Sequence, residues 1–264
     1  MGYERHPVFE EPTDQHKLWR FISFTKYVAM LDQRALYFAR ARYLGDRFEG
    51  SNTRMNIEAF EEILRSTFPD MPEDERHARV SQERDNMAKV NEGMTLFHLI
   101  NCWHESDHES AAMWKLYASE DAGIAVQTTM RRLREALHTD ETVYIGRVHY
   151  IDYDATPIPA DNLFWPFLHK RQSFSHEREV RAIIARIPII DDMDERQARD
   201  SVIDWTDPGD TGINIAVDLD SLLESVRVSP SAPGWFVNVT LSVTERYGVD
   251  IAVERSTLGV DPLF

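Results

Sequence analysis

Two glutamates and an arginine alternate within the segment 175–184, which reads SHEREVRAII. In a β-strand, the two-residue period places Glu177, Glu179 and Arg181 on one face, with neighbours in that row roughly 6–7 Å apart. A carboxylate held beside a guanidinium can do acid–base or electrostatic work. An exposed strand end with paired charges is the simpler interpretation of the same pattern. Glu179 and Glu177 are therefore the first candidate catalytic residues.

Aromatic side chains gather between positions 103 and 117, where Trp103, His104, Trp114 and Tyr117 lie. Such rings can line a flat slot for an aromatic ligand. The helical spacing of Met113, Trp114 and Tyr117 is equally typical of a helix face packed in a core. The sequence alone leaves both interpretations open.

A third candidate region combines an early basic residue with an acidic turn. Arg20 lies in an apolar segment, where a charge is costly unless it is paired or binds an anion. A salt bridge to Asp46 or Glu49, in the turn-like segment 43–52, is the structural alternative. Ser23 follows Arg20 closely and is a candidate for the same pocket.

Three histidines, His98, His104 and His108, raise the possibility of a metal-dependent hydrolase. Their spacing matches no metal-binding motif such as HExxH. On a strand, His98 shares a face with apolar neighbours and with Cys102, which indicates a buried histidine and an inert thiol. We therefore expect no metal, and the chain also has no glycine-rich phosphate-binding motif.

Composition limits the classes of protein that remain. The chain has 264 residues, 42% of them hydrophobic, one cysteine, and a formal net charge of −16. Its acidity argues against bulk binding to nucleic acid, which needs a positive field. No apolar stretch approaches the ~20 residues of a membrane span, and the N-terminus lacks the apolar core of a signal peptide. We expect a cytoplasmic protein that binds no membrane.

Hydrophobic periodicity predicts an α+β fold, because strands and helices intermix without a strict βαβ alternation. We expect a flexible arm over 1–16 and a single domain over 17–264, with a helical insertion near 55–90 and a mixed or mostly antiparallel sheet flanked by helices. The expected strands are 18–21, 35–39, 94–103, 123–127, 142–150, 177–187, 213–217, 226–228 and 250–254. The expected helices are 25–32, 57–65, 73–90, 109–118, 128–137, 161–174, 219–224 and 235–247.

Taken together, the motifs resemble the bacterial family called domain of unknown function 2971. In chain order they are W-R-F-x-S at 19–23, ALYFARARYLGDRFEG at 35–50, C-W-H at 102–104, M-W-K-L-Y-A at 113–118 before a glycine-led strand, K-R-x-x-F-x-x-E-x-E-V-R at 170–181, and V-x-V-S-P-x-A-P at 226–233. The resemblance covers about residues 17–258.

This layout is more distantly similar to ADP-ribosyltransferase-like folds, which carry an early basic strand, an aromatic or serine-containing middle strand and a late strand with the catalytic glutamate. The similarity implies that Glu179 is the catalytic acid and Glu177 the second glutamate of the pair. It implies that Arg20 contacts the diphosphate or ribose of NAD and that Trp114 or Tyr117 stacks on nicotinamide. The implied pocket is completed by Ser23, Arg181, Asp46, Glu49, Trp103 and His104.

The leading hypothesis is an NAD-using, ADP-ribosyltransferase-like enzyme that acts in phage defence or as a toxin, on an unidentified macromolecular target. Cleavage of the nicotinamide–ribose bond passes through an oxocarbenium-like state, which a carboxylate stabilises. The alternative is a non-catalytic module that binds a nucleotide or a protein in the same cleft. The third hypothesis is the metal-dependent hydrolase built on the histidines.

Overall fold

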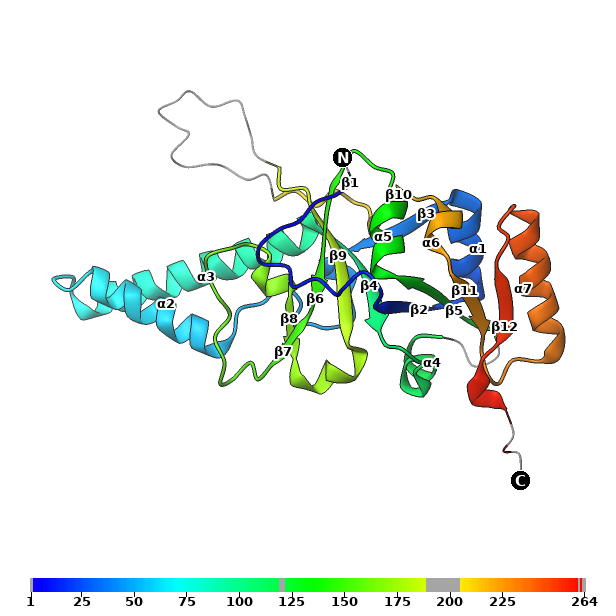
Figure 1. Ribbon diagram of the computed structural model, residues 1–264. Helices are drawn as coiled ribbons and strands as arrows, with labels where there is room; N and C mark the ends of the chain where they lie inside the picture. The colour runs from blue at the N-terminus through cyan, green and yellow to red at the C-terminus, as the bar shows by residue number, and fades with distance from the viewer. Residues whose placement is uncertain (1, 119–121, 189–204, 261, 263–264) are drawn as a thin grey trace.

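The computed structural model describes residues 2–118, 122–188, 205–260 and 262 (Figure 1). Over these residues the chain forms a large, mostly antiparallel sheet with helices packed around it, which confirms the predicted mixture of helices and strands. No helix in this part of the chain has the length and apolarity that a membrane span requires.

One path of the sheet runs through neighbouring strands from one edge to the other. In spatial order these strands are β1 (Gly2–Tyr3), β6 (Thr142–Arg147), β9 (Glu179–Ala185), β4 (His98–Glu105), β2 (Lys17–Ser23), β5 (Gly123–Thr129), β11 (Ser225–Val228) and β12 (Ala252–Arg255). The pairs β1–β6 and β11–β12 are parallel, and the other pairs on this path are antiparallel.

The sheet divides at β4, because two strands share one of its edges. β2 pairs with the end of β4, placing Trp19 opposite His104. β3 (Ala35–Arg40) pairs with its beginning, placing Ala39 opposite Ile100, and β10 (Gly212–Ala216) extends the sheet beyond β3. The segment 101–103 therefore has no strand partner on this edge in the described pairings. We call this interval the sheet gap.

One face of the sheet carries the main hydrophobic core. Leu18, Leu99, Val126 and Val180 point into it from four adjacent strands. Four helices contribute buried side chains to the same core: α1 (Phe24–Gln33), α5 (Met130–Ala136), α6 (Leu219–Leu222) and α7 (Gly234–Arg246). We call this side the helix-covered face.

The opposite face is covered by shorter elements. A second sheet of two parallel strands, β7 (His149–Ile151) and β8 (His169–Arg171), lies here with α4 (Ala111–Tyr117). The 3-10 segments of the described chain are η1 (Ala41–Tyr43), η2 (Trp165–Phe167), η3 (Gln172–Glu177) and η4 (Thr257–Gly259). Two separate apolar clusters, one around Phe167 and Ile183 and one around Phe21 and Trp114, leave room for polar groups between them.

The predicted helical insertion is an antiparallel pair, α2 (Arg54–Thr67) and α3 (Glu73–Phe97). Figure 1 shows this pair projecting from one end of the molecule, away from the sheet. α2 buries no residue fully, whereas the last turn of α3 enters the core before β4 begins. The predicted strand 94–103 is thus helical over its first four residues.

Two further expectations need correction. The segment 161–174, predicted as a helix, forms η2, β8 and the start of η3, with Pro166 inside η2. The arm predicted to be flexible is packed in the structure over its described residues: β1 joins the sheet edge, and Phe9 is 5% exposed against the Phe167 cluster. A few isolated apolar residues in a polar stretch give no periodic signal, so the sequence did not indicate this packing.

Candidate functional site

The two candidate glutamates are brought together by a break in the strand that was predicted to hold both. Glu177 is the last residue of η3, Arg178 adopts a left-handed backbone with φ of 41°, and β9 begins at Glu179. The alternation predicted for Glu177 is therefore wrong, because the left-handed residue reverses the chain direction locally. Both carboxylates nevertheless approach the same ammonium group.

That ammonium group belongs to Lys170 on β8. Its Nζ lies 2.5 Å from Oε2 of Glu177 and 3.3 Å from Oε2 of Glu179. The lysine side chain is only 11% exposed, so solvent screens these pairs weakly. The sequence analysis missed Lys170 as a site residue, although it is the first letter of the K-R-x-x-F-x-x-E-x-E-V-R motif.

Arg181 completes the ionic core of the site. It is fully buried and contacts both carboxylate oxygens of Glu49, while its Nε lies 2.9 Å from Oε1 of Glu179. It also donates to the Phe167 carbonyl oxygen at 2.6 Å. Burial alone would raise the pKa of Glu179, but Arg181 and Lys170 outweigh that effect and lower this pKa to about 2. We call Glu49, Lys170, Glu177, Glu179 and Arg181 the glutamate cluster.

The register places several predicted residues on the face that carries the cluster, which we call the glutamate face. His104 lies opposite Glu179 and Cys102 opposite Arg181 in the β4–β9 pair. Directly opposite residues share a face. The Nδ1 atom of His104 lies 2.5 Å from the backbone oxygen of Glu177, and burial lowers the pKa of this imidazole.

α4 supplies an aromatic wall beside the cluster. Trp114 packs edge-on against Phe21, with ring centroids 5.1 Å apart, and its Nε1 donates to Glu109 at 3.1 Å. The Tyr117 hydroxyl donates to Oε1 of Glu177. Trp114 is thus a core residue at the edge of the site, whereas Tyr117 touches a candidate catalytic group directly.

Arg20 lies on the opposite side of the sheet, at the sheet gap. It sits between Trp19 and Phe21 in β2, so alternation directs it to the helix-covered face, where its guanidinium lies 6.0 Å from the Trp103 ring. It donates to the Tyr37 carbonyl oxygen at 3.4 Å. Within the described residues it forms no ion pair with a carboxylate, and burial lowers its pKa.

The neighbours of Arg20 in the gap also have unused hydrogen-bonding capacity. Asn101 Nδ2 donates to the same Tyr37 oxygen at 2.9 Å, while its Oδ1 has no partner in the described structure. Trp103 Nε1 is buried without a partner as well. Cys102 lies in the same interval of β4, but its half-buried side chain is on the glutamate face, opposite Arg181. Burial and Glu179 raise the pKa of this thiol well above its usual value.

The acidic turn, residues 43–52, contributes its carboxylates to the glutamate face and does not pair with Arg20. Glu49 pairs with Arg181, as described above, and Asp46 accepts from Arg171 at 2.6 Å. Ser23 is the N-cap of α1, where its hydroxyl accepts from the Lys26 amide at 3.3 Å. The structure therefore places Ser23 at a helix start, away from the glutamate cluster.

The three histidines do not come together. His98 and His104 lie at opposite ends of β4, six residues or roughly 20 Å apart. His98 is fully buried, stacked on Phe167 with centroids 3.9 Å apart, and His108 is exposed. Among the residues that the structure describes, no group of three or more His, Cys, Asp or Glu side chains is arranged to hold a metal ion.

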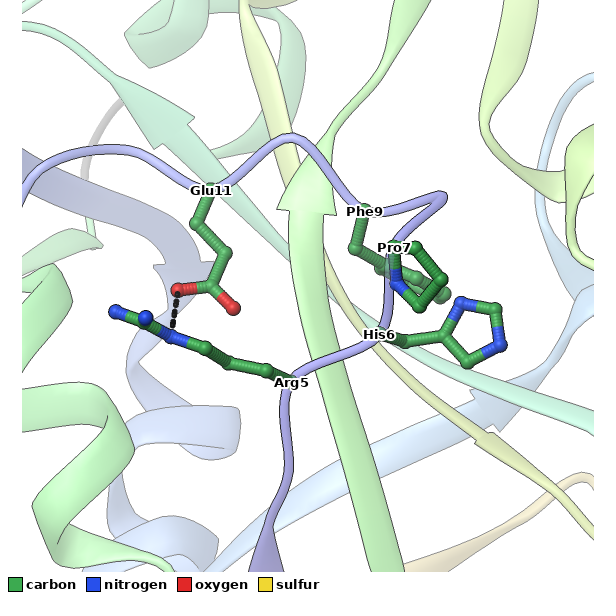
Figure 2. A pocket seen from close by; sticks show the side chains of 5 residues that line it. All are labelled: Arg5, His6, Pro7, Phe9 and Glu11. Carbon is green, nitrogen blue, oxygen red and sulfur yellow. Dashed lines mark ion pairs between the residues drawn. The ribbon is translucent and has the colours of Figure 1, made fainter.

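A surface hollow lies elsewhere, within the N-terminal segment. Figure 2 shows its lining, Arg5, His6, Pro7, Phe9 and Glu11, with Arg5 paired to Glu11 at 3.7 Å. None of the residues predicted for the site lines this hollow.

Comparison of the chain with protein-family models, curated proteins and solved structures finds no match. The resemblance drawn from the motifs therefore remains a prediction.

Proposed function

We propose that the chain is an ADP-ribosyltransferase-like enzyme that uses NAD, with Glu179 and Glu177 as its working carboxylates. The observation that carries the proposal is the convergence of both glutamates on Lys170 beside Tyr117. The strand order supports it, since β2, β4 and β9 lie side by side as the early, middle and late strands of that layout. The ADP-ribosyltransferase-like fold is itself proposed together with the activity.

Backbone strain at the same place supports the proposal further. Arg178, between the two glutamates, holds a left-handed conformation that costs a non-glycine residue about 1 kcal/mol or more. Strained residues of this kind concentrate at functional sites. Here the strain turns Glu177 towards Lys170 and away from the row that a regular strand would form.

In the proposed reaction, the C1′–N bond between ribose and nicotinamide breaks and its electron pair leaves with nicotinamide. Glu179, ionised because its pKa is about 2, stabilises the positive charge that develops on the ribose. An acceptor oxygen or nitrogen then bonds to C1′ and loses its proton, with Glu177 orienting the acceptor. When water is the acceptor, the products are ADP-ribose, nicotinamide and a proton.

Arg20 is the cation that we propose for the diphosphate. It has no carboxylate partner in the described structure, and it lies beside the sheet gap on the helix-covered face, whereas the glutamates lie on the other face. This assignment requires a dinucleotide that reaches both faces of the sheet beside the sheet gap. Guanidinium groups suit phosphate oxygens because they offer paired donors in one plane.

The test is the release of nicotinamide from NAD by the purified chain, together with transfer of labelled ADP-ribose to proteins of a cell lysate. We expect Glu179→Gln to abolish both, while Glu141→Gln, which changes an exposed carboxylate paired with Arg186, keeps them. Circular dichroism and a melting curve establish that each variant is folded at the assay temperature. Full activity of Glu179→Gln would refute the assignment.

A second candidate is a non-catalytic module that binds a nucleotide at the same place. It is favoured by the burial of Glu179, which is 5% exposed, and by the fact that both of its carboxylate oxygens are already bonded to Arg181 or Lys170. This candidate predicts a higher melting temperature with NAD or ADP-ribose and no nicotinamide release. The metal-dependent hydrolase has no comparable support, since its three histidines lie apart.

A further inference from the structure

Tyr117 covers the glutamate cluster from the solvent side. Its side chain is half-exposed, at 47%, while Glu177, which its hydroxyl contacts, is 4% exposed. The phenol therefore lies between bulk water and a carboxylate that has little other access. The remaining oxygen of Glu177 is bonded to Lys170, so the oxygen that Tyr117 contacts is the one available to an incoming group.

The way in which α4 is anchored allows this cover to move. Met113 and Trp114 are buried against the Phe21 cluster, and Ser110 caps the start of the helix by accepting from the Met113 amide at 3.3 Å. Leu116 and Tyr117, at the other end, are exposed. Tyr117 can thus leave Glu177 by a side-chain rotation that exposes no core residue.

We propose that Tyr117 is a reversible cover over the glutamate cluster, and that a ligand enters by offering Glu177 a hydroxyl group in place of the phenol. The exchange conserves the hydrogen bond: one O–H donor leaves the carboxylate and another takes its position. A sugar hydroxyl, such as that of a ribose, provides this donor. The identity of the ligand rests on the proposed function, whereas the opening of the cover does not.

The chain contains its own reporter for the opening, because Cys102 is its single cysteine. Cys102 faces the same side of the sheet as the cluster, directly opposite Arg181 in the β4–β9 pair, and its side chain is only partly exposed. The rate at which a small thiol reagent modifies Cys102 in the native protein therefore measures how often the cover opens. A hydrogen bond to a charged group favours the bonded, closed state over the open state by about tenfold or more.

We expect Tyr117→Phe to increase the rate of Cys102 modification by about tenfold. Tyr3→Phe is the matched control, since the Tyr3 hydroxyl donates to a glutamate as well, Glu11, at 2.6 Å, on the N-terminal segment. It should leave the rate unchanged. Unchanged rates for both Tyr117→Phe and Tyr117→Ala would overturn the proposal.

Global unfolding must be separated from local opening. The free energy of unfolding of each variant in urea gives the fraction unfolded, and hence the rate expected from global unfolding alone. A rate increase that this fraction fully explains would also overturn the proposal. An increase in excess of it supports the local cover.

A final arm of the experiment tests the ligand. Under the proposal, NAD or ADP-ribose protects Cys102 of the wild-type chain from modification. An analogue of the same nucleotide without the ribose hydroxyls protects less. If Tyr117→Phe speeds modification but neither nucleotide protects, the cover stands and the nucleotide function fails. If nucleotides protect equally well in the wild-type chain and in both Tyr117 variants without any change in the basal rate, the cover fails and the nucleotide function stands.

Discussion

Lys170 and Glu177 form a buried ion pair of 2.5 Å between a strand of the small second sheet and a 3-10 turn. The same ammonium group lies 3.3 Å from Glu179, so one cation holds two carboxylates that would otherwise repel each other. Two close carboxylates without a shared cation do not both stay ionised, because the charge on one raises the pKa of the other. Lys170 is therefore a positioning residue for the pair.

The first prediction concerns the removal of that cation. We expect Lys170→Met to reduce the free energy of unfolding by about 3–5 kcal/mol, since it leaves the buried Glu177 carboxylate without its cation. Urea unfolding at neutral pH measures the change. Adding Glu177→Gln to Lys170→Met should recover part of the loss, because one unpaired charge disappears. Strict additivity of the two substitutions would show that the pair is not coupled.

The second prediction concerns Glu49, which contacts both terminal nitrogens of Arg181. Glu49→Gln keeps the shape of the side chain but removes its charge from a fully buried pair, so we expect a loss of about 3 kcal/mol. The matched control is Glu58→Gln, which breaks the exposed pair with Arg54 on α2 and should leave the urea midpoint unchanged. Equal effects of the two substitutions would contradict the structural role of Glu49.

Local patterns in the sequence predicted most elements, because hydrophobic periodicity and turn residues act over a few positions. They predicted α7 and the α2–α3 pair within a few residues, apart from the last turn of α3. They failed over 161–174, where the apolar run 163–168 has the density of a helix but Pro166 removes a backbone donor. In the structure these residues form a short 3-10 segment and a short strand, and their side chains cover the sheet.

The candidate site was predictable in its residue types but not in its partners. Glu177, Glu179 and Tyr117 do come together. The pairing of Glu49 with Arg181, however, joins positions 132 residues apart, which no local period encodes. Arg20 was predicted to line the same pocket as the glutamates, yet alternation from Trp19, opposite His104, directs it to the other face, beside the sheet gap. That gap follows from how β2 and β3 share β4, a property of the topology.

The third prediction tests the packing of the N-terminal segment. A Cβ added to Gly146 would lie 2.9 Å from Cβ of Phe9 and 3.0 Å from its Cα, closer than such atoms approach. We expect Gly146→Ala to displace this segment from the sheet and to cost about 1–3 kcal/mol. Limited proteolysis should then cleave within residues 2–16 faster than in the wild-type chain. An unchanged cleavage rate would show that Phe9 is not held there.

The fourth prediction is a loss of stability in mild acid caused by His98. Burial lowers the pKa of this imidazole from 6.5 to about 4, so the unfolded chain binds a proton in a pH range where the folded chain does not. Stability is therefore full above pH 6.5 and falls as the pH drops towards 4, by about 3 kcal/mol for this residue. His104 and His169, whose pKa values burial also lowers, act in the same direction. Glu179, with a pKa of about 2, contributes only below about pH 4.5, so its effect is separate.

Urea unfolding at pH 7.5 and pH 4.5 measures this effect. Between these two pH values, the free energy of unfolding should fall less for His98→Phe than for the wild-type chain. An equal fall would mean that His98 becomes protonated without unfolding.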